Sequence, residues 1–170
     1  MGRSRPNTDL NMRTFCAITL LVFAGCAGHL SLAQAITAHN LFSRLLSDAS
    51  DAYTPLYATV AAAELGKPQA DADYYKAMKP YDDVVYALRA CQEAENAVNG
   101  LLAQCVAAGD GDCSAARTGF ACAASALDLL STSYGQIKGG APLYAATAVA
   151  KAQLIELANG ATCEASYASH

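Results

Sequence analysis

Apolar side chains recur at alternating steps of four and three residues through the middle of the chain. One such series starts shortly after Tyr81 and consists of Val84, Leu88, Cys91, Val98, Leu102 and Cys105. Glu95 occupies the remaining position of this series. Because residues at this spacing share one helical face, we predict a long helix that begins near Tyr81 and buries a bundle seam. Glycine and aspartate at 109–112 are expected to end it.

Two further apolar stripes follow, separated by the glycines at 139 and 140. The first stripe consists of Phe120, Ala124, Leu127, Leu130 and Tyr134. The second consists of Leu143, Ala146, Ala150, Leu154 and Leu157. Pro142 suits the first turn of a helix and Asn159-Gly160 suits its C-terminal cap, so these residues predict the bounds of the last helix.

The N-terminal part of the chain shows shorter helical signals. Four apolar residues share one helical face: Leu41, Phe42, Leu45 and Leu46. They predict a first helix over residues 36–47. Thr54-Pro55 is typical of an N-cap followed by the first helical turn, and this second segment is expected to end at Gly66. A third short helix over residues 70–78 is expected to end before Pro80.

The composition fits closely packed helices. Alanine is the commonest residue, at 38 of 170 positions, and no alternating run of β-branched residues predicts a strand. We therefore predict an all-α, up-and-down bundle of about four main helices with an N-terminal helical extension. Residues 36–80 are expected to form the extension, residues 81–160 the bundle body and residues 161–170 a flexible tail.

The first 35 residues have the layout of a secretory signal peptide. Three arginines precede the apolar run Phe15–Gly25, and Ala33-Gln34-Ala35 is a small-x-small cleavage site. The run is shorter than the roughly 20 residues that span a bilayer, which disfavours a membrane anchor. Translation starts at Met1 or at Met12, and the sequence leaves that choice open. We expect a secreted, extracellular protein with no membrane contact after the leader is removed.

Charge and apolar content exclude two classes of protein. With 54% apolar and 15% charged residues, the chain is too apolar and too weakly charged to be disordered. Acids outnumber bases 15 to 11, so there is no basic excess for binding nucleic acid. Removal of residues 1–35 takes away three arginines and one aspartate, which leaves 8 bases, 14 acids and a net charge of −6.

Five cysteines follow the leader: Cys91, Cys105, Cys113, Cys122 and Cys163. In an oxidising compartment they are expected to pair, which allows at most two bridges and leaves one thiol over. A zinc site would need close cysteine pairs or nearby histidines. The gaps here are 13, 7, 8 and 40 residues without an intervening histidine, so we expect disulfides and no metal.

The two helices that flank the turn at 109–112 restrict the pairing. If they are antiparallel, Cys105 faces Cys113, and we predict that bridge. Cys91 is then level with about residue 128, roughly 9 Å from Cys122 along the helix, so a Cys91–Cys122 bridge needs a kink or a longer turn. Cys91–Cys163 stays open as well. The candidate disulfide residues are Cys105, Cys113, Cys91 and Cys122, with Cys163 as the candidate free cysteine that joins two copies in a dimer.

Little in the sequence predicts catalysis. After the leader only His39 and the terminal His170 remain as histidines, and His39 is expected to be solvated near a fraying end. Asp110 and Asp112 resemble the start of a calcium loop, but its twelfth position is Ala121 instead of glutamate. Carboxylates two residues apart on a helix point to different faces. We expect no catalytic residue, no cofactor and no enzymatic activity.

Tyrosine is concentrated in one region. Six tyrosines fall within 34 residues: Tyr53, Tyr57, Tyr74, Tyr75, Tyr81 and Tyr86. Tyrosine is favoured at protein interfaces because it buries a large area and keeps a polar tip. The candidate interface residues are Tyr74, Tyr75, Tyr81 and Tyr86. Alternatively, half of the tyrosines fill the junction between the extension and the bundle.

Three segments resemble plant invertase/pectin methylesterase inhibitors: Leu45-Leu46-Ser47-Asp48, the run that ends Ala87-Leu88-Arg89-Ala90-Cys91, and Ala141-Pro142-Leu143 with the alanine-rich helix to Leu157. The resemblance covers most of the chain after the leader. It implies a secreted four-helix bundle with an N-terminal helical extension, which inhibits a cell-wall carbohydrate enzyme by docking a helical face. On this likeness the long helix from Tyr81 contributes to the contact.

The chain also departs from the pattern of that family. It has no cysteine between Ile36 and Ala90, where the family's hairpin carries two, and Ser131-Thr132-Ser133 stands where a bridge partner is expected. The Pro-Lys-Phe loop of the invertase inhibitors has no counterpart near 109–112, so matching assigns no contact residue. Two other hypotheses stay open. One is a secreted helical interaction protein or apolar-ligand carrier, and the other is an enzyme that uses His39 or converging carboxylates.

Overall fold

The computed structural model describes residues 28–68, 70–109 and 111–164. The described chain forms four α-helices: α2 (Leu32–Leu65), α3 (Asp71–Ala108), α4 (Ala116–Gln136) and α5 (Ala141–Ala158). Several sequence predictions lie outside these ranges, namely those on residues 1–27 with both start methionines, on Asp110, and on residues 165–170 with His170.

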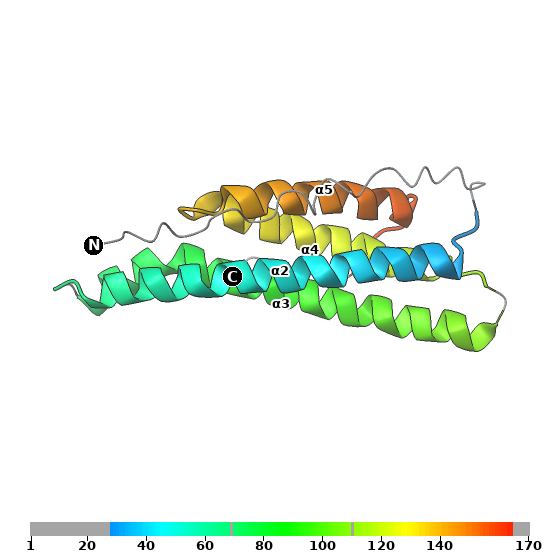
Figure 1. Cartoon of the computed structure of the whole chain (residues 1–170), viewed down its shortest axis with the longest axis horizontal. Helices are drawn as coiled ribbons and strands as arrows, with labels where there is room; N and C mark the ends of the chain where they lie inside the picture. Colours follow the sequence, from blue (N-terminus) through cyan, green and yellow to red (C-terminus); the bar gives the residue numbers. More distant parts are fainter. Residues whose placement is uncertain (1–27, 69, 110, 165–170) are drawn as a thin grey trace, which may run out of the picture.

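The four helices run up and down in a bundle. α3 packs against both α2 and α4, α4 packs along α5, and α2 makes a smaller contact with α5 (Figure 1). Within the described ranges the strand-like pairing consists of an isolated bridge between Ser31 and Asp112. None of the described helices combines the length and apolarity needed to cross a membrane. The predicted all-α, up-and-down bundle is confirmed.

The apolar series of α3 forms the centre of the core, as its spacing predicts. Val84, Cys91 and Val98 have no exposed surface. The predicted stripe of α4 is buried against the same core and includes Phe120, Leu127, Leu130 and Tyr134. Gly119 permits the close approach of α4 to α3, because a Cβ atom there would lie 3.0 Å from side-chain atoms of both Leu101 and Val98.

Two prolines lie inside helices instead of ending them. α2 continues through Pro55 and α3 continues through Pro80, so the prediction of three short helices over 36–80 is wrong. The hydroxyl of Thr54 donates to the carbonyl of Ser50 within α2 and does not cap a new helix. Pro55 and Asp51 are both exposed, so the carbonyl that lacks an amide partner lies on the solvent side of α2.

The outer parts of α2 and α3 project as a helical hairpin beyond the ends of α4 and α5 (Figure 1). We define residues 56–78 as the distal hairpin. Among its described residues only Met78 is buried. The N-terminal extension therefore exists as the outer part of two long helices, and α2 and α3 belong to both the extension and the bundle.

The fold begins before the first helix that the sequence predicts. α2 starts at Leu32 instead of Ile36, and Ser31 is its N-cap. Leu30 is 3% exposed and Ala35 is fully buried. The predicted signal peptide includes residues 28–35, yet these residues are part of the folded unit.

α5 ends where the sequence predicts, whereas the segment after α5 differs from its prediction. Asn159 ends the helix in the left-handed conformation predicted for its cap. A disulfide at Cys163 then ties the described residues 161–164 to α4. The prediction of a flexible tail is therefore wrong for this part of it.

Candidate functional site

Two disulfides cross-link one end of the bundle. Cys105 and Cys113 are joined across the turn between α3 and α4, with their Cα atoms 5.2 Å apart, as the antiparallel arrangement predicts. The second disulfide joins Cys122 to Cys163, with a Cα separation of 4.7 Å. The candidate Cys91–Cys122 pair is wrong, because Cys91 lies in the core while Cys122 contacts the segment after α5. Cys163 is also not left over, so it does not link two copies.

Cys91 remains a free thiol without exposed surface. Burial raises the pKa of Cys91 to about 12. Tyr134 of α4 lies close to it, and the pKa of Tyr134 is raised first by burial and then by the negative charge that Cys91 would carry. A thiol that stays protonated and out of contact with solvent is a poor nucleophile and metal ligand. Cys91 is therefore a side chain of the core.

Three of the six clustered tyrosines fill the base of the distal hairpin. This agrees with the alternative prediction that half of them fill the junction between the extension and the bundle. The hydroxyl of Tyr53 donates to the main-chain carbonyl of Tyr81, and its ring lies 6.0 Å from that of Tyr57. The hydroxyl of Tyr57 donates to the carboxylate of Asp82 at 3.0 Å, and this bond raises the pKa of Tyr57. Tyr81 is only 9% exposed. It therefore joins α2 to α3 instead of forming part of an outer interface.

Two of the other candidate tyrosines lie on the outside of α3, and the third, Tyr74, packs partly against the core. Tyr75 is 67% exposed and Tyr86 is 47% exposed, whereas Tyr74 is half-buried with its ring 5.6 Å from that of Tyr75. Tyr75 and Tyr86 are about three helical turns apart and so point the same way. Lys79 and Arg89 are exposed on the same face. We call Tyr75, Lys79, Tyr86 and Arg89 the α3 stripe.

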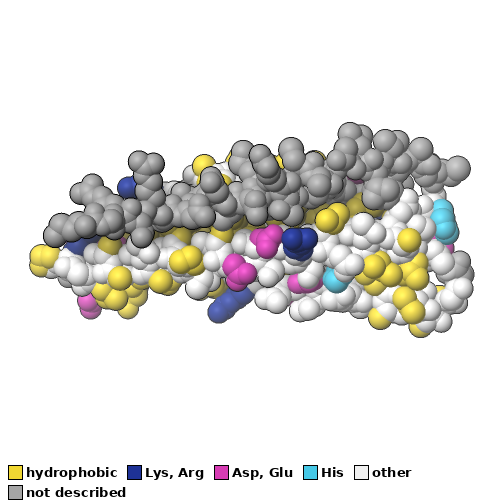
Figure 2. Space-filling model, in the orientation of Figure 1, with side chains coloured by type: hydrophobic (Ala, Val, Ile, Leu, Met, Phe, Trp, Pro, Cys, Tyr) yellow, Lys and Arg dark blue, Asp and Glu magenta, His cyan; other side chains and the backbone are white. Residues whose placement is uncertain are grey.

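The distal hairpin adds an apolar surface next to this stripe. Hydrophobic side chains gather over it, at the left-hand end of the molecule in Figure 2. Leu65 at the end of α2 is 71% exposed. Charges in this region form local pairs, between Lys67 and Glu64 and between Lys79 and Asp83. Aromatic and apolar side chains bordered by charges of both signs are typical of a protein interface.

Glu95, the polar residue in the apolar series of α3, meets a histidine of α2. Its Oε1 atom lies 3.8 Å from Nε2 of His39, and the two side chains are 15% and 13% exposed. The expectation of a solvated His39 is wrong, because α2 starts earlier and places this residue within the helix pair. The described residues contain no cluster of three side chains suited to a metal. The pair is a contact between α2 and α3.

A shallow groove of about 360 Å³ lies where α4, α5 and the segment after α5 meet. Its lining is rich in alanine and includes Cys163, and the ion pair of Lys151 with Asp128 is part of its wall. Ser125, Asp128 and Ile155 are exposed, so the groove is open to solvent. It does not enclose a ligand as a carrier cavity would.

These surfaces and contacts are the features from which a function has to be inferred. The α3 stripe is exposed and chemically varied, while the His39–Glu95 pair and Cys91 lie inside the bundle. Comparison with known proteins adds no relative, since no family model, curated protein or solved structure matches the chain.

Proposed function

We propose that the protein is a secreted inhibitor that docks the α3 stripe and the distal hairpin against a cell-wall carbohydrate enzyme of the pectin methylesterase or invertase type. The observation that carries this proposal is the projecting hairpin (Figure 1) together with the exposed tyrosines and basic side chains of the α3 stripe. Tyrosine and arginine are the residues that most often supply binding energy at protein interfaces. Substrate sites of enzymes are concave, and a projecting helical hairpin fits beside or into such a cleft.

The rigidity of the hairpin supports this role. The α3 stripe extends over about 21 Å of a continuous helix, so its side chains hold fixed relative positions before any contact. The hydrogen bonds of Tyr53 and Tyr57 join the base of the hairpin to the bundle. Binding by such a surface requires little ordering of the backbone, which lowers the entropic cost of association.

The cysteines support the extracellular location. Four of the described cysteines form two disulfides, and disulfides persist in oxidising compartments. Together with the signal-peptide layout of the N-terminal sequence, they favour export. The alternative function is that of a secreted helical interaction protein, for which the open, alanine-lined groove beside Cys163 is an available surface.

The test is an inhibition assay with purified protein against pectin methylesterase and acid invertase. The wild-type protein is expected to inhibit one of them at micromolar concentration. In the double variant Tyr75→Ala/Tyr86→Ala the inhibition constant is expected to rise about 30-fold, which corresponds to about 2 kcal/mol of lost binding energy. Both rings are exposed, so the double variant is expected to remain folded, which its melting curve checks.

Tyr144→Ala provides the matched control. Tyr144 lies on α5 and is 49% exposed, close to the exposure of Tyr86, but it is not part of the α3 stripe. This variant is expected to inhibit like the wild type. Absence of inhibition of both enzymes by the wild-type protein contradicts the proposed function. Equal loss of inhibition in the control and in the stripe variant contradicts the proposed surface.

A further inference from the structure

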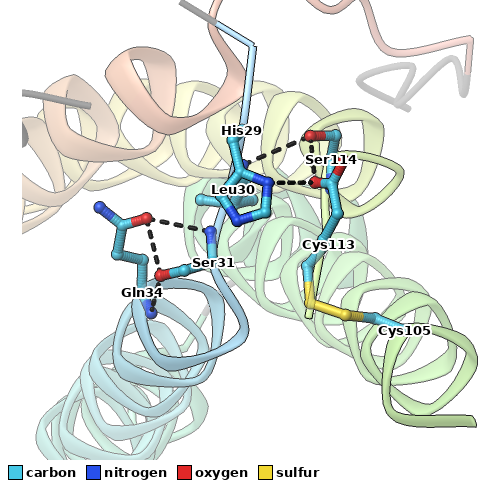
Figure 3. Close-up of a disulfide and its surroundings, with 8 residues drawn as sticks. His29, Leu30, Ser31, Gln34, Cys105, Cys113 and Ser114 are labelled. Carbon is cyan, nitrogen blue, oxygen red and sulfur yellow. Dashed lines mark hydrogen bonds and ion pairs between the residues drawn. A yellow bond between two sulfur atoms is a disulfide. The ribbon is translucent and has the colours of Figure 1, made fainter. Parts of the chain in front are cut away.

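Residues 28–31, which we call the N-terminal strap, cross the turn between α3 and α4 beside the Cys105–Cys113 disulfide (Figure 3). The amide of Cys113 donates to the carbonyl of Leu30 at 2.7 Å, and the amide of Leu30 donates to the hydroxyl of Ser114 at 3.3 Å. That hydroxyl also lies 2.9 Å from the carbonyl oxygen of Gly28. The strap is thus held at Leu30 by one hydrogen bond between main-chain groups and by a second one to the Ser114 hydroxyl, and the Gly28 carbonyl lies within reach of the same hydroxyl.

The strap also carries side chains that the fold uses. Leu30 is 3% exposed and belongs to the core. Nδ1 of His29 lies 3.5 Å from the carboxylate of Asp112. A segment with a buried leucine and paired main-chain groups has the properties of a domain edge and not those of a disposable leader.

Residues 31–35 form the start of α2. The hydroxyl of Ser31 accepts from the amide of Gln34 at 3.3 Å, and Oε1 of Gln34 accepts from the amide of Ser31 at 3.0 Å, which is a reciprocal capping box. Ala35 at the end of this turn is fully buried. Cleavage after Ala35 would remove the cap, the first turn of α2 and the core side chain of Leu30 together.

We propose that the signal peptide is removed between Ala27 and Gly28, so that the processed protein begins with the N-terminal strap. This proposal rests on the secretion that the proposed function assumes. Gly25 and Ala27 supply small residues at the third and first positions before this bond, and Gly25 is the last residue of the apolar run Phe15–Gly25. The reaction is hydrolysis of one peptide bond, and it leaves a free amino group on Gly28.

The test uses the full chain, with a C-terminal affinity tag, expressed in a eukaryotic host that secretes it. N-terminal sequencing and the intact mass of the secreted protein are expected to give a chain that starts at Gly28. A start at Ile36 overturns the proposal, and so does a chain that keeps residues 1–27. Inhibition is assayed with purified protein, whether it starts at Gly28 or at Ile36. The position of the cleavage site and the proposed inhibitor function are therefore tested separately.

Two arginine substitutions distinguish the two cleavage sites within the same full chain. Ala27→Arg places a large charged residue directly before the proposed bond and is expected to abolish the Gly28 start. Ala33→Arg places the same residue at the third position before the alternative bond, where Ala33 is exposed in the folded protein. This variant is expected to be secreted in wild-type yield with the Gly28 start. The reverse pattern overturns the proposal.

Discussion

At the scale of single residues, the state of each cysteine depends on contacts that the linear spacing does not contain. The spacing limits five cysteines to two bridges and brings Cys105 and Cys113 together across a turn. It does not reveal that Cys91 faces the core while Cys122 faces the segment after α5. Which way each cysteine faces depends on how α3 and α4 are rotated about their axes. The packing of core residues such as Tyr134 and Leu127 determines this rotation, and a periodic pattern does not.

The buried thiol gives a direct prediction. With the pKa of Cys91 raised to about 12 and no exposed surface, the native protein is expected to resist alkylation at Cys91 at neutral pH, with a rate at least about 100-fold below that of the unfolded chain. Peptide mapping after treatment with iodoacetamide, before and after unfolding in denaturant without reductant, measures this. Rapid modification of the Cys91 peptide in the native protein contradicts the buried position.

Asp112 gives a pH dependence. Its carboxylate accepts from the hydroxyl of Ser114 and from the amide of the same residue at 3.0 Å, and these bonds, the one from the hydroxyl first, lower the pKa of Asp112. Because the folded-state pKa lies below the ordinary value of 3.8, the ionised carboxylate stabilises the fold at and above that pH. This contribution is lost as the pH falls through the lowered pKa.

The measurement compares the melting temperatures of the wild type and Asp112→Asn as a function of pH. The wild type is expected to melt at the higher temperature at neutral pH, and the difference should shrink to zero as the pH falls well below 3.8. Asp82→Asn is a control at another hydrogen-bonded carboxylate, where Tyr57 donates to the side chain. A wild-type advantage at Asp112 that grows on acidification contradicts the assigned hydrogen bonds.

At the scale of helices, the bounds of α4 and α5 could be predicted from glycine and apolar periodicity, whereas those of α2 and α3 could not. Proline signals favoured breaks at Pro55 and Pro80, yet both helices continue. The packing of α2 against α3 outweighs the loss of one hydrogen bond at each proline. Likewise, the small residues of Ala33-Gln34-Ala35 are typical of a cleavage site but also fit the first turn of a buried helix.

A continuous α2 and a helix that starts at Thr54 predict opposite effects of substitutions at Thr54 and Pro55 on the free energy of unfolding. Pro55→Ala restores an amide donor at an exposed position and is expected to raise the free energy of unfolding by about 2 kcal/mol. Thr54→Ala is expected to change it by less than about 0.5 kcal/mol, whereas loss of a true N-cap would cost about 1 kcal/mol. Urea titrations of both variants measure these values. A clear loss in Thr54→Ala with no gain in Pro55→Ala would contradict the continuous helix.

The two disulfides are expected to differ in their effect on stability. The Cys105–Cys113 bridge closes a short loop with a sequence separation of 8, and the Cys122–Cys163 bridge closes a loop with a separation of 41. In the chain-entropy model their removal costs about 2.5 and about 4 kcal/mol respectively. Denaturant titration of the double variants Cys105→Ala/Cys113→Ala and Cys122→Ala/Cys163→Ala compares them. A larger loss for the shorter loop would show that local contacts, and not loop closure, set the contribution.

At the scale of the whole molecule, the bundle could be predicted from the sequence, and the surface that we propose for docking only in part. The fold class is predicted by helical periodicity, alanine content and the absence of strand patterns. These signals are the same whatever the exact bounds of the helices are. The exposure of Tyr75 and the burial of Tyr81 depend on where α4 ends against the two longer helices. That length difference creates the projecting hairpin, and it is visible only when all helix bounds are known.

The two ends of the molecule are held by different means, and this has a consequence for its motions. Both disulfides and the N-terminal strap lie towards one end, while the distal hairpin depends on hydrogen bonds and packing near its base. Local stability therefore falls along the long axis, and amide protons near Leu65 are expected to exchange through openings that leave the cross-linked end folded. The cross-linked end is therefore expected to keep its fold, and its slow amide exchange, under conditions in which the tip of the hairpin already exchanges.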